Sequence, residues 1–368
     1  MPSYEYVIPK GNFLWEGKGP QQFECKKDIM PEVEFYGDLK NNNLDSCTVD
    51  TKMGKANPKV NKCVNLVKNF FKKMKYPDAK LVYIVHGFKG DAKKPWLQEL
   101  KNNLIKRYKS DRTVVGIVVW KEGARLLVKP DGHYPIAASN TWPIGNVLAY
   151  LHVNIAKDIK HKFLNICIGH SLGAHLCGFF SKMLKRQEQL FQVDRIIGLD
   201  PAGQIFQNPR QDTTLRLDIN DAIHTEIIHT NAKSGSETTR FGSFGFEKPI
   251  GHTDIYVNGG FKQPSCARDV VPQCSHKFAY LFMVELAKQA NEQSQCTARW
   301  RHQGRFPIAY EKLKSITKEE VDKLESAGFE QQDQNNVVRI GDLGIVSKMK
   351  GVFWVEVGET SETCRFSL

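Results

Sequence analysis

The feature that most constrains this chain is a serine between two glycines at the end of an apolar run. In the segment NICIGHSLGAH, Ser171 lies between Gly169 and Gly173, and residues 166–168 before it are strand-like. The segment that follows, AHLCGFFSKMLK, has apolar residues at helical spacing. A serine on a sharp strand-to-helix turn adopts a strained backbone conformation, and its neighbours need glycine because a Cβ there would meet the adjacent strand and helix. The sequence therefore predicts a nucleophile elbow in an α/β fold.

A nucleophilic serine needs an acid and a base, and in this fold class both follow it along the chain. The strand-like run 195–199 ends at Asp200, and Pro201 stops it there. An aspartate at this position lies at the carboxyl edge of a parallel sheet, where ligands bind. Asp200 is therefore the candidate acid, and its alternative role is that of a turn residue.

The candidate bases are the histidines beyond Asp200. They are His224, His229, His252, His276 and His302. The first two belong to the strand-like run AIHTEIIHT, which favours a core or surface role for them. His276 follows Cys274 and opens the helix-like segment HKFAYLFMVELAKQ, so a loop held by the cysteine would place it well for catalysis. Position along the chain alone does not decide between these alternatives.

An oxyanion hole is indicated by a second strand end. The apolar run 81–85 is of the buried-strand type and ends in His86-Gly87-Phe88. In this architecture one amide donor comes from that loop and the other from the residue after the nucleophile. The candidate donors are thus the N–H groups of Phe88 and Leu172, unless the loop is an ordinary turn.

Taken together, these segments resemble the animal pancreatic lipase family, in the branch of arthropod neutral lipases and insect venom phospholipases A1. The matching runs are LVYIVHGF at 81–88, GHSLGAH at 169–175, GLDPAG at 198–203, IHT at 228–230, GHTDIYVNGG at 251–260 and CSH at 274–276. The resemblance implies an α/β-hydrolase fold, a mostly parallel central sheet with helices on both faces. It also implies Ser171 as nucleophile, Asp200 as acid and His276 as base, with the Phe88 and Leu172 amides in the oxyanion hole. Such relatives hydrolyse carboxylic esters of glycerolipids.

Chain length favours a single catalytic domain over residues 1–368, in which residues 1–30 form an N-terminal extension. The 368 residues, 41% of them hydrophobic, suffice for one large α/β core. They are too few for that core plus the C-terminal β-sandwich lipid-binding domain of the vertebrate enzymes. Residues 317–327 read as a short capped helix, and KGVFWVEV at 350–357 is expected to add an edge strand to the sheet.

Nine cysteines indicate an oxidising compartment, and we expect a secreted protein. No signal segment is visible at the start, so either a signal was removed or the start is not the native one. The resemblance implies a disulfide between Cys266 and Cys274 that closes a lid loop.

The remaining cysteines are less determined by the sequence. Cys296 and Cys364 are a plausible second pair, whereas Cys167 and Cys177 flank the elbow and are expected to be free buried thiols. The pairing among Cys25, Cys47 and Cys63 stays open.

Substrate class depends on two loops that give opposite indications. The lid, 267–273, is short and carries Arg268 and Asp269, which favours access of charged phospholipid headgroups. The facing loop, about 230–251, is long and contains phenylalanines that would bind acyl chains, which favours triglycerides. Those phenylalanines are Phe241, Phe244 and Phe246.

The net charge of +12 is concentrated near the N-terminus. Residues 59–75 form a basic amphipathic pattern whose apolar face would pack on the sheet, or else lie on an anionic membrane. Nucleic acid is not expected because no binding motif accompanies the basic residues. No apolar stretch is long enough for a transmembrane helix.

A structural calcium ion is the one bound metal that the sequence suggests, and ester hydrolysis by a serine requires no cofactor. Vertebrate members of the resembled family hold a structural calcium between acid and base, where this chain has Asp218 and Asp221. Two carboxylates three residues apart with nearby carbonyls suit a hard cation. They would equally suit a solvated turn.

Two functions are compatible with these patterns. One is a lipid esterase, and the other is a non-catalytic lipid-binding or yolk-type storage protein on the same fold. Storage relatives have lost the nucleophile, whereas this chain keeps Ser171, Asp200 and His276. The esterase is therefore the favoured interpretation.

Overall fold

The computed structural model describes most of the catalytic core. The described residues are 29–39, 45–51, 58–74, 76–125, 133–187, 192–207, 212–232, 243–266 and 273–288, the short strands 13–15, 18–21, 297–299, 337–339 and 351–355, and residue 357. The predicted helix at 317–327, the Cys296–Cys364 pair, Cys25 and His302 lie outside this part of the chain.

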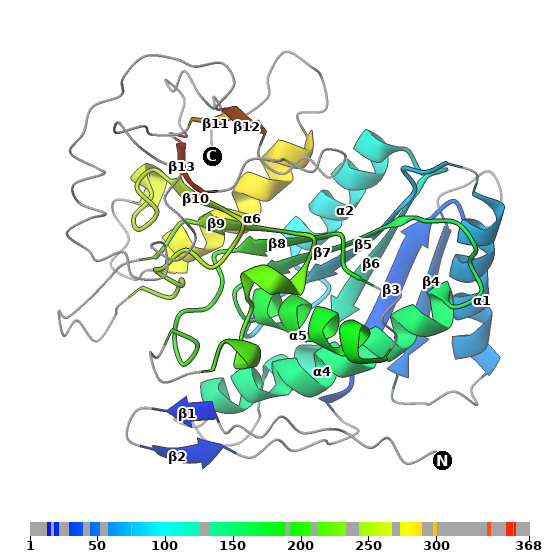
Figure 1. The fold of residues 1–368 in the computed structure, drawn as a ribbon, viewed down its shortest axis with the longest axis horizontal. Helices are drawn as coiled ribbons and strands as arrows, with labels where there is room; N and C mark the ends of the chain where they lie inside the picture. Colours follow the sequence, from blue (N-terminus) through cyan, green and yellow to red (C-terminus); the bar gives the residue numbers. More distant parts are fainter. Residues whose placement is uncertain are drawn as a thin grey trace.

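A long twisted sheet forms the centre of the molecule (Figure 1). Its strand order is β12-β11-β13-β10-β9-β8-β7-β5-β6-β3-β4. The strands from β13 to β6 in that order run parallel, and antiparallel pairs flank them on both sides. The bounds are β3 Glu32–Gly37, β4 Asp45–Asp50, β5 Lys80–Val85, β6 Thr113–Val119, β7 Leu164–His170, β8 Arg195–Leu199, β9 His224–His229, β10 Thr253–Val257, β11 Thr297–Arg299, β12 Val337–Arg339 and β13 Gly351–Val355. A separate hairpin, β1 Phe13–Trp15 with β2 Lys18–Gln21, lies near α4.

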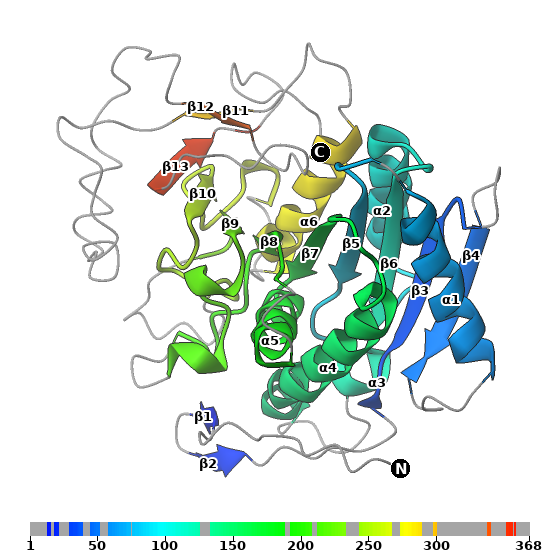
Figure 2. The same ribbon diagram turned by 45° about the vertical axis from the view of Figure 1, so that its right-hand side comes forward.

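Helices cover both faces of the sheet (Figure 2). Their bounds are α1 Pro58–Lys73, α2 Pro95–Tyr108, α3 Lys121–Ala124, α4 His133–Ala156, α5 Leu172–Gln187 and α6 Gln273–Lys288. One hydrophobic core joins α1, α4 and α5 to the sheet, and a second joins α2 and α6 to the opposite face. The predicted α/β architecture, mostly parallel with helices on both faces, is confirmed.

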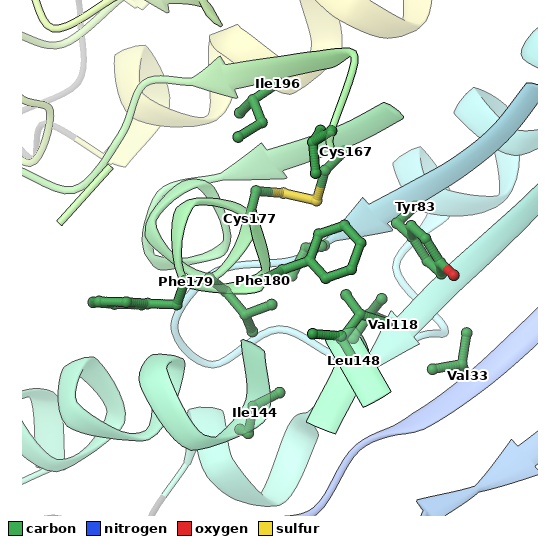
Figure 3. Packing of buried hydrophobic residues seen from close by; sticks show 14 of the residues in the cluster. Val33, Tyr83, Val118, Ile144, Leu148, Cys167, Cys177, Phe179, Phe180 and Ile196 are labelled. Atoms are coloured by element: carbon green, nitrogen blue, oxygen red, sulfur yellow. A yellow bond between two sulfur atoms is a disulfide. The ribbon is translucent and has the colours of Figure 1, made fainter. Parts of the chain in front are cut away.

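The first of these cores contains an unexpected disulfide (Figure 3). Cys167 on β7 is bonded to Cys177 on α5, with a Cα–Cα distance of 5.8 Å. The prediction of free thiols at these positions was wrong, because α5 turns back from the elbow directly onto the strand that precedes it and brings the two side chains together. Both residues are fully buried among the aromatic side chains Tyr83 and Phe180.

Two further expectations concern helix α1 and strand β13. The apolar face of α1 packs on the core through Val67, Phe70 and Phe71, as predicted. The strand β13 joins the sheet but does not form its edge, because β11 pairs with its other side. Its buried Phe353 explains this internal position, since that side chain belongs to the core under α6.

The strand ends place the predicted site residues on one edge of the sheet. In a parallel sheet all carboxyl ends meet at the same edge, and ligands bind where the strand order reverses. Here β5 continues to β6 on one side, while β7, β8 and β9 follow on the other. The crevice between the ends of β5 and β7 is therefore the expected binding position.

Candidate functional site

Ser171 occupies the turn between β7 and α5. Its φ of 57° lies in the left-handed region, which is strained for a residue with a side chain. The surrounding structure holds this conformation: the Ser171 amide donates to the carbonyl of Leu199 at 3.0 Å, and the amide of Ala174 donates to the Ser171 carbonyl at 3.1 Å. The predicted elbow is present.

The two glycines of the elbow are required by close backbone contacts. A Cβ on Gly169 would lie 2.3 Å from the carbonyl oxygen of Gly173. A Cβ on Gly173 would lie 2.4 Å from the carbonyl oxygen of Val85, at the end of β5. Any side chain at either position would push α5 away from the sheet and displace Ser171.

Asp200 follows β8 and is completely buried. Its Oδ1 accepts hydrogen bonds from the amides of Thr230 at 2.9 Å and Asn231 at 3.0 Å. Its Oδ2 lies 2.6 Å from Nδ1 of His276. The carboxylate is therefore fixed by the loop after β9 and directed at a single histidine.

His276 lies in the first turn of α6, next to the disulfide between Cys266 and Cys274. The predicted lid disulfide is present in the structure, with a Cα–Cα distance of 5.7 Å. The imidazole of His276 is 4.6 Å, centre to centre, from that of His170, which directly precedes Ser171. Asp200 and His276 are thus in direct contact, and His276 lies close to the residue that precedes Ser171.

His170 supports this arrangement from the elbow itself. Its Nε2 lies 3.0 Å from the carbonyl oxygen of His276. Burial, and next the nearby His276, lowers the pKa of His170 well below its ordinary value. The ring is neutral at neutral pH and donates its Nε2 proton to that carbonyl, an interaction that spacing along the sequence does not reveal.

The loop after β5 lies directly against the serine. A Cβ on Gly87 would be 2.8 Å from Cβ of Ser171 and 3.3 Å from its Oγ. In the described part of the chain, no backbone carbonyl accepts a hydrogen bond from the amide of Phe88 or Leu172. Both predicted oxyanion donors therefore belong to backbone segments that adjoin Ser171.

His86 and Trp120 brace this loop. The indole Nε1 donates to the His86 carbonyl at 2.8 Å, and the Trp120 amide donates to His86 Nε2 at 3.3 Å. Burial lowers the pKa of His86 to about 4, so its neutral ring donates from Nδ1 to the Gly87 carbonyl at 3.0 Å. The sequence pattern gives no sign of this support because Trp120 follows a different strand, β6.

The other candidate histidines that the structure describes, His224, His229 and His252, have different partners. His252 Nδ1 accepts from the amide of Thr225, and His224 Nε2 contacts Thr253 Oγ1, both at the amino ends of β9 and β10. His229 is fully buried and pairs with Asp254 at 2.9 Å. The structure therefore selects His276 as the partner of Asp200.

Asp218 and Asp221 lie apart from the catalytic residues and cap a short 3₁₀ turn. Both oxygens of Asp221 accept from the ammonium of Lys182 at 2.5 Å, and Lys182 also donates to the Arg216 carbonyl at 2.8 Å. Asp218 accepts from Asn220. A calcium ion needs several free oxygen ligands. In this structure the ammonium of Lys182 engages the carboxylate of Asp221, and the described residues hold no cluster of three or more His, Cys, Asp or Glu side chains.

The long loop facing the lid contributes one described aromatic ring to the site. Phe244 is 5.5 Å, centre to centre, from the imidazole of His276. Phe246, by contrast, is buried in the core, so it does not offer the acyl-binding surface predicted for it. Phe241 and residues 267–272 lie outside the described part of the chain.

Comparison with known proteins places this geometry in context. Residues 33–277 match the family model described as Lipase. The chain is 35% identical over 213 residues to a phospholipase A1 of Vespula squamosa, an alignment that covers 57% of this chain and 65% of the wasp protein. It is also 35% identical over 198 residues to pancreatic triacylglycerol lipase of Oryctolagus cuniculus, covering 53% of this chain and 38% of that protein.

The chain thus spans less than two thirds of either relative's length. A solved α/β hydrolase from a deep-sea metagenome library, MGS-M1, aligns with 70% of this chain at a TM-score of 0.26 and 12% identity.

Proposed function

This chain belongs to the lipase family, and from that premise we propose that it is a lipid esterase using Ser171, Asp200 and His276. The observation that carries the proposal is the 2.6 Å contact between Asp200 and His276, beside a serine held in the strained elbow conformation. A storage protein has no need for this constellation, because strained backbone and paired buried polar groups cost stability.

The mechanism follows from the geometry. His276 Nε2 takes the proton of Ser171 Oγ as the oxygen attacks the ester carbonyl, and Asp200 holds the imidazole in orientation and stabilises its charged form. The amides of Phe88 and Leu172 donate to the developing oxyanion. His276 returns the proton to the departing alcohol, which leaves the acyl group on Ser171. In the second half, His276 takes a proton from a water molecule that attacks the acyl carbonyl, and it returns this proton to Ser171 Oγ as the acid departs.

The substrate we propose is the sn-1 ester of phospholipids, together with measurable triglyceride hydrolysis. The similarity to a wasp phospholipase A1 and to a pancreatic triacylglycerol lipase supports this mixed preference. The short lid predicted from the sequence would give charged headgroups access to the serine, and Phe244 adds an apolar surface beside His276.

The compartment and partners form part of the proposal. The structure contains disulfides Cys47–Cys63, Cys167–Cys177 and Cys266–Cys274, which are typical of proteins from oxidising compartments. We propose secretion, and preferential binding to anionic lipid surfaces because of the net charge of +12. In the described part of the chain, no helix has the length and apolarity to cross a membrane. Activity should withstand a metal chelator, because Lys182 supplies the positive charge beside Asp221.

The test compares wild type with Ser171→Ala on triolein and phosphatidylcholine emulsions, with positional analysis of the products. Turnover should fall on the order of a millionfold, as for serine hydrolases that lose their nucleophile, while the fold is retained. Covalent labelling of Ser171 by an organophosphonate provides a second readout. An alanine variant that retains wild-type turnover would rule out Ser171 as the nucleophile.

A further inference from the structure

Gln263 is a fully buried amide that joins three segments at the carboxyl edge of the sheet. Its Nε2 donates to the carbonyls of Thr230 and Val257, each at 2.9 Å. Its Oε1 accepts from Asn258 Nδ2 at 3.1 Å. Two carbonyl acceptors fix the orientation of the amide, because only an NH₂ group can donate to both.

The hydrogen bond to Thr230 connects Gln263 to Asp200, the proposed acid, through one peptide group. The carbonyl of Thr230 and the amide of Asn231 belong to the same peptide group. Gln263 donates to that carbonyl at 2.9 Å, and the amide at the other end donates to Asp200 Oδ1 at 3.0 Å. Hydrogen bonds in series polarise one another, so the bond from Gln263 strengthens the donor that holds the carboxylate.

The backbone of Gln263 forms hydrogen bonds with the segments on either side of the disulfide next to His276, the proposed base. Its amide donates to Ser275 Oγ at 3.0 Å, and Ser275 directly precedes His276. Its carbonyl accepts from the amide of Cys266, which is linked by a disulfide to Cys274 in the same first turn of α6. One residue therefore contacts the segment that holds Asp200 and the segment that carries His276.

We propose that Gln263 is a positioning residue for ester hydrolysis, which sets the placement of Asp200 relative to His276 through the Thr230–Asn231 peptide and Ser275. The proposal rests on the proposed function. A buried amide that merely satisfied its neighbours would contribute to stability, whereas a positioning residue also affects turnover, because small displacements of catalytic groups have large effects on rate.

The test is Gln263→Met, a variant of similar length that cannot donate to either carbonyl. For a soluble short-chain ester, kcat should fall on the order of tenfold to a hundredfold. KM should change by less than about twofold, because the interaction acts on the chemical step. The proton on His276 Nδ1, observed far downfield in the ¹H NMR spectrum, should shift or broaden as the contact with Asp200 changes.

Ser275→Ala gives an independent second variant, because it removes only a hydroxyl group and leaves the Gln263 side chain intact. Its kcat should fall on the order of threefold to tenfold, the size of one ordinary hydrogen bond. Thr253→Val is the matched control. It loses a buried contact to His224 between β9 and β10, at the amino ends of these strands, whereas Gln263 contacts residues at their carboxyl ends. Its kcat and its downfield signal should match those of wild type.

The outcomes separate this proposal from the proposed function. An active wild type whose Gln263→Met and Ser275→Ala variants keep kcat and the downfield signal would overturn the positioning role alone. Equal losses in Thr253→Val would overturn it too, by showing a general effect of stability. A folded wild type that hydrolyses no ester would overturn the proposed function, and the positioning role with it.

Discussion

The molecule contains two buried histidine–aspartate pairs at neighbouring strand ends, and only one is placed for chemistry. His276 Nδ1 lies 2.6 Å from Asp200, and His229 Nε2 lies 2.9 Å from Asp254. Both aspartates are at most 1% exposed. The residue types and the burial of the carboxylates are the same, so the difference in function arises from what surrounds the second ring nitrogen.

The second nitrogen of His229 is committed to the backbone. Its Nδ1 lies 2.9 Å from the carbonyl of Phe246, so both ring nitrogens are within hydrogen-bond distance of a protein oxygen. Asp254 in turn accepts from the amides of Ile250 and Gly251. This pair therefore fixes the loop between β9 and β10 and has no nitrogen left for proton transfer.

The second nitrogen of His276 has a different environment. The side chain is 11% exposed, and no described residue forms a hydrogen bond with its Nε2. Its ring is tilted by 45° relative to that of His170, which directly precedes the serine, with the ring centres 4.6 Å apart. Under the proposed function, the two pairs differ because only His276 keeps a ring nitrogen available for proton transfer to a reacting group.

The largest effect that this comparison predicts is on turnover. His276→Ala should lower kcat on the order of a millionfold, as losing the base does in other serine hydrolases. His229→Ala should instead lower the melting temperature. Ester hydrolysis and calorimetry on both variants measure this, and a His276→Ala variant that retains activity would remove the distinction between the pairs.

A smaller loss of kcat is expected when Asp200 is replaced by asparagine, which has the same shape but no charge. Asp200→Asn should lower kcat by about four orders of magnitude with KM little changed, because an amide neither stabilises the imidazolium nor fixes the right tautomer. Steady-state kinetics with a soluble ester measures this loss. If Asp254→Asn produced the same loss, the second pair would be catalytic as well.

For Asp254→Asn the comparison predicts a loss of stability with little change in kcat. Replacing one carboxylate oxygen by an NH₂ group leaves at least one of the buried donors on His229, Ile250 and Gly251 without an acceptor, which costs on the order of 1–3 kcal/mol of unfolding free energy. Denaturant unfolding of the variant and of wild type measures this cost, with kcat determined at a temperature where both are folded. Wild-type stability in this variant would show that the contact between His229 and Asp254 contributes little to the stability of the fold.

The sequence was sufficient to predict the parts of the site that depend on local structure. Ser171 with Gly169 and Gly173 requires a specific backbone turn, and Asp200 follows directly from the end of a strand. The base was harder, because several histidines follow Asp200 and only the family resemblance distinguished His276 before the structure paired it with the acid.

Features that depend on tertiary distances could not be predicted. The disulfide between Cys167 and Cys177 requires that α5 pack back on β7, which no residue pattern reports. Gln263 binds partners from separate segments, and the ammonium of Lys182 reaches Asp221 from another helix. In each case the contact depends on how separate segments pack against one another. The spacing of residues within a segment predicts only whether that segment is a helix or a strand.

The smallest predicted effect concerns buried histidines whose pKa values are lowered mainly by burial. Burial lowers the pKa of His152 to about 3, and its Nδ1 lies 3.2 Å from the hydroxyl of Tyr83. Because burial raises the pKa of Tyr83 far above its ordinary value, the hydroxyl stays protonated and donates to the neutral ring. His175 and His86 also have lowered pKa values, of about 3 and about 4, mainly through burial.

These depressed values determine the direction of the pH dependence. Below the unfolded-state pKa of about 6.5 the unfolded chain binds protons that the folded chain excludes, so stability is full above that pH and falls toward pH 4. His152→Gln removes one such group and keeps a neutral polar side chain. Its unfolding free energy should therefore fall less steeply than that of wild type between pH 6 and pH 4, by at most about 1.4 kcal/mol per pH unit. Denaturant titrations at three pH values measure the two slopes, and identical slopes would mean that His152 is protonated in the folded state, as a paired histidine would be.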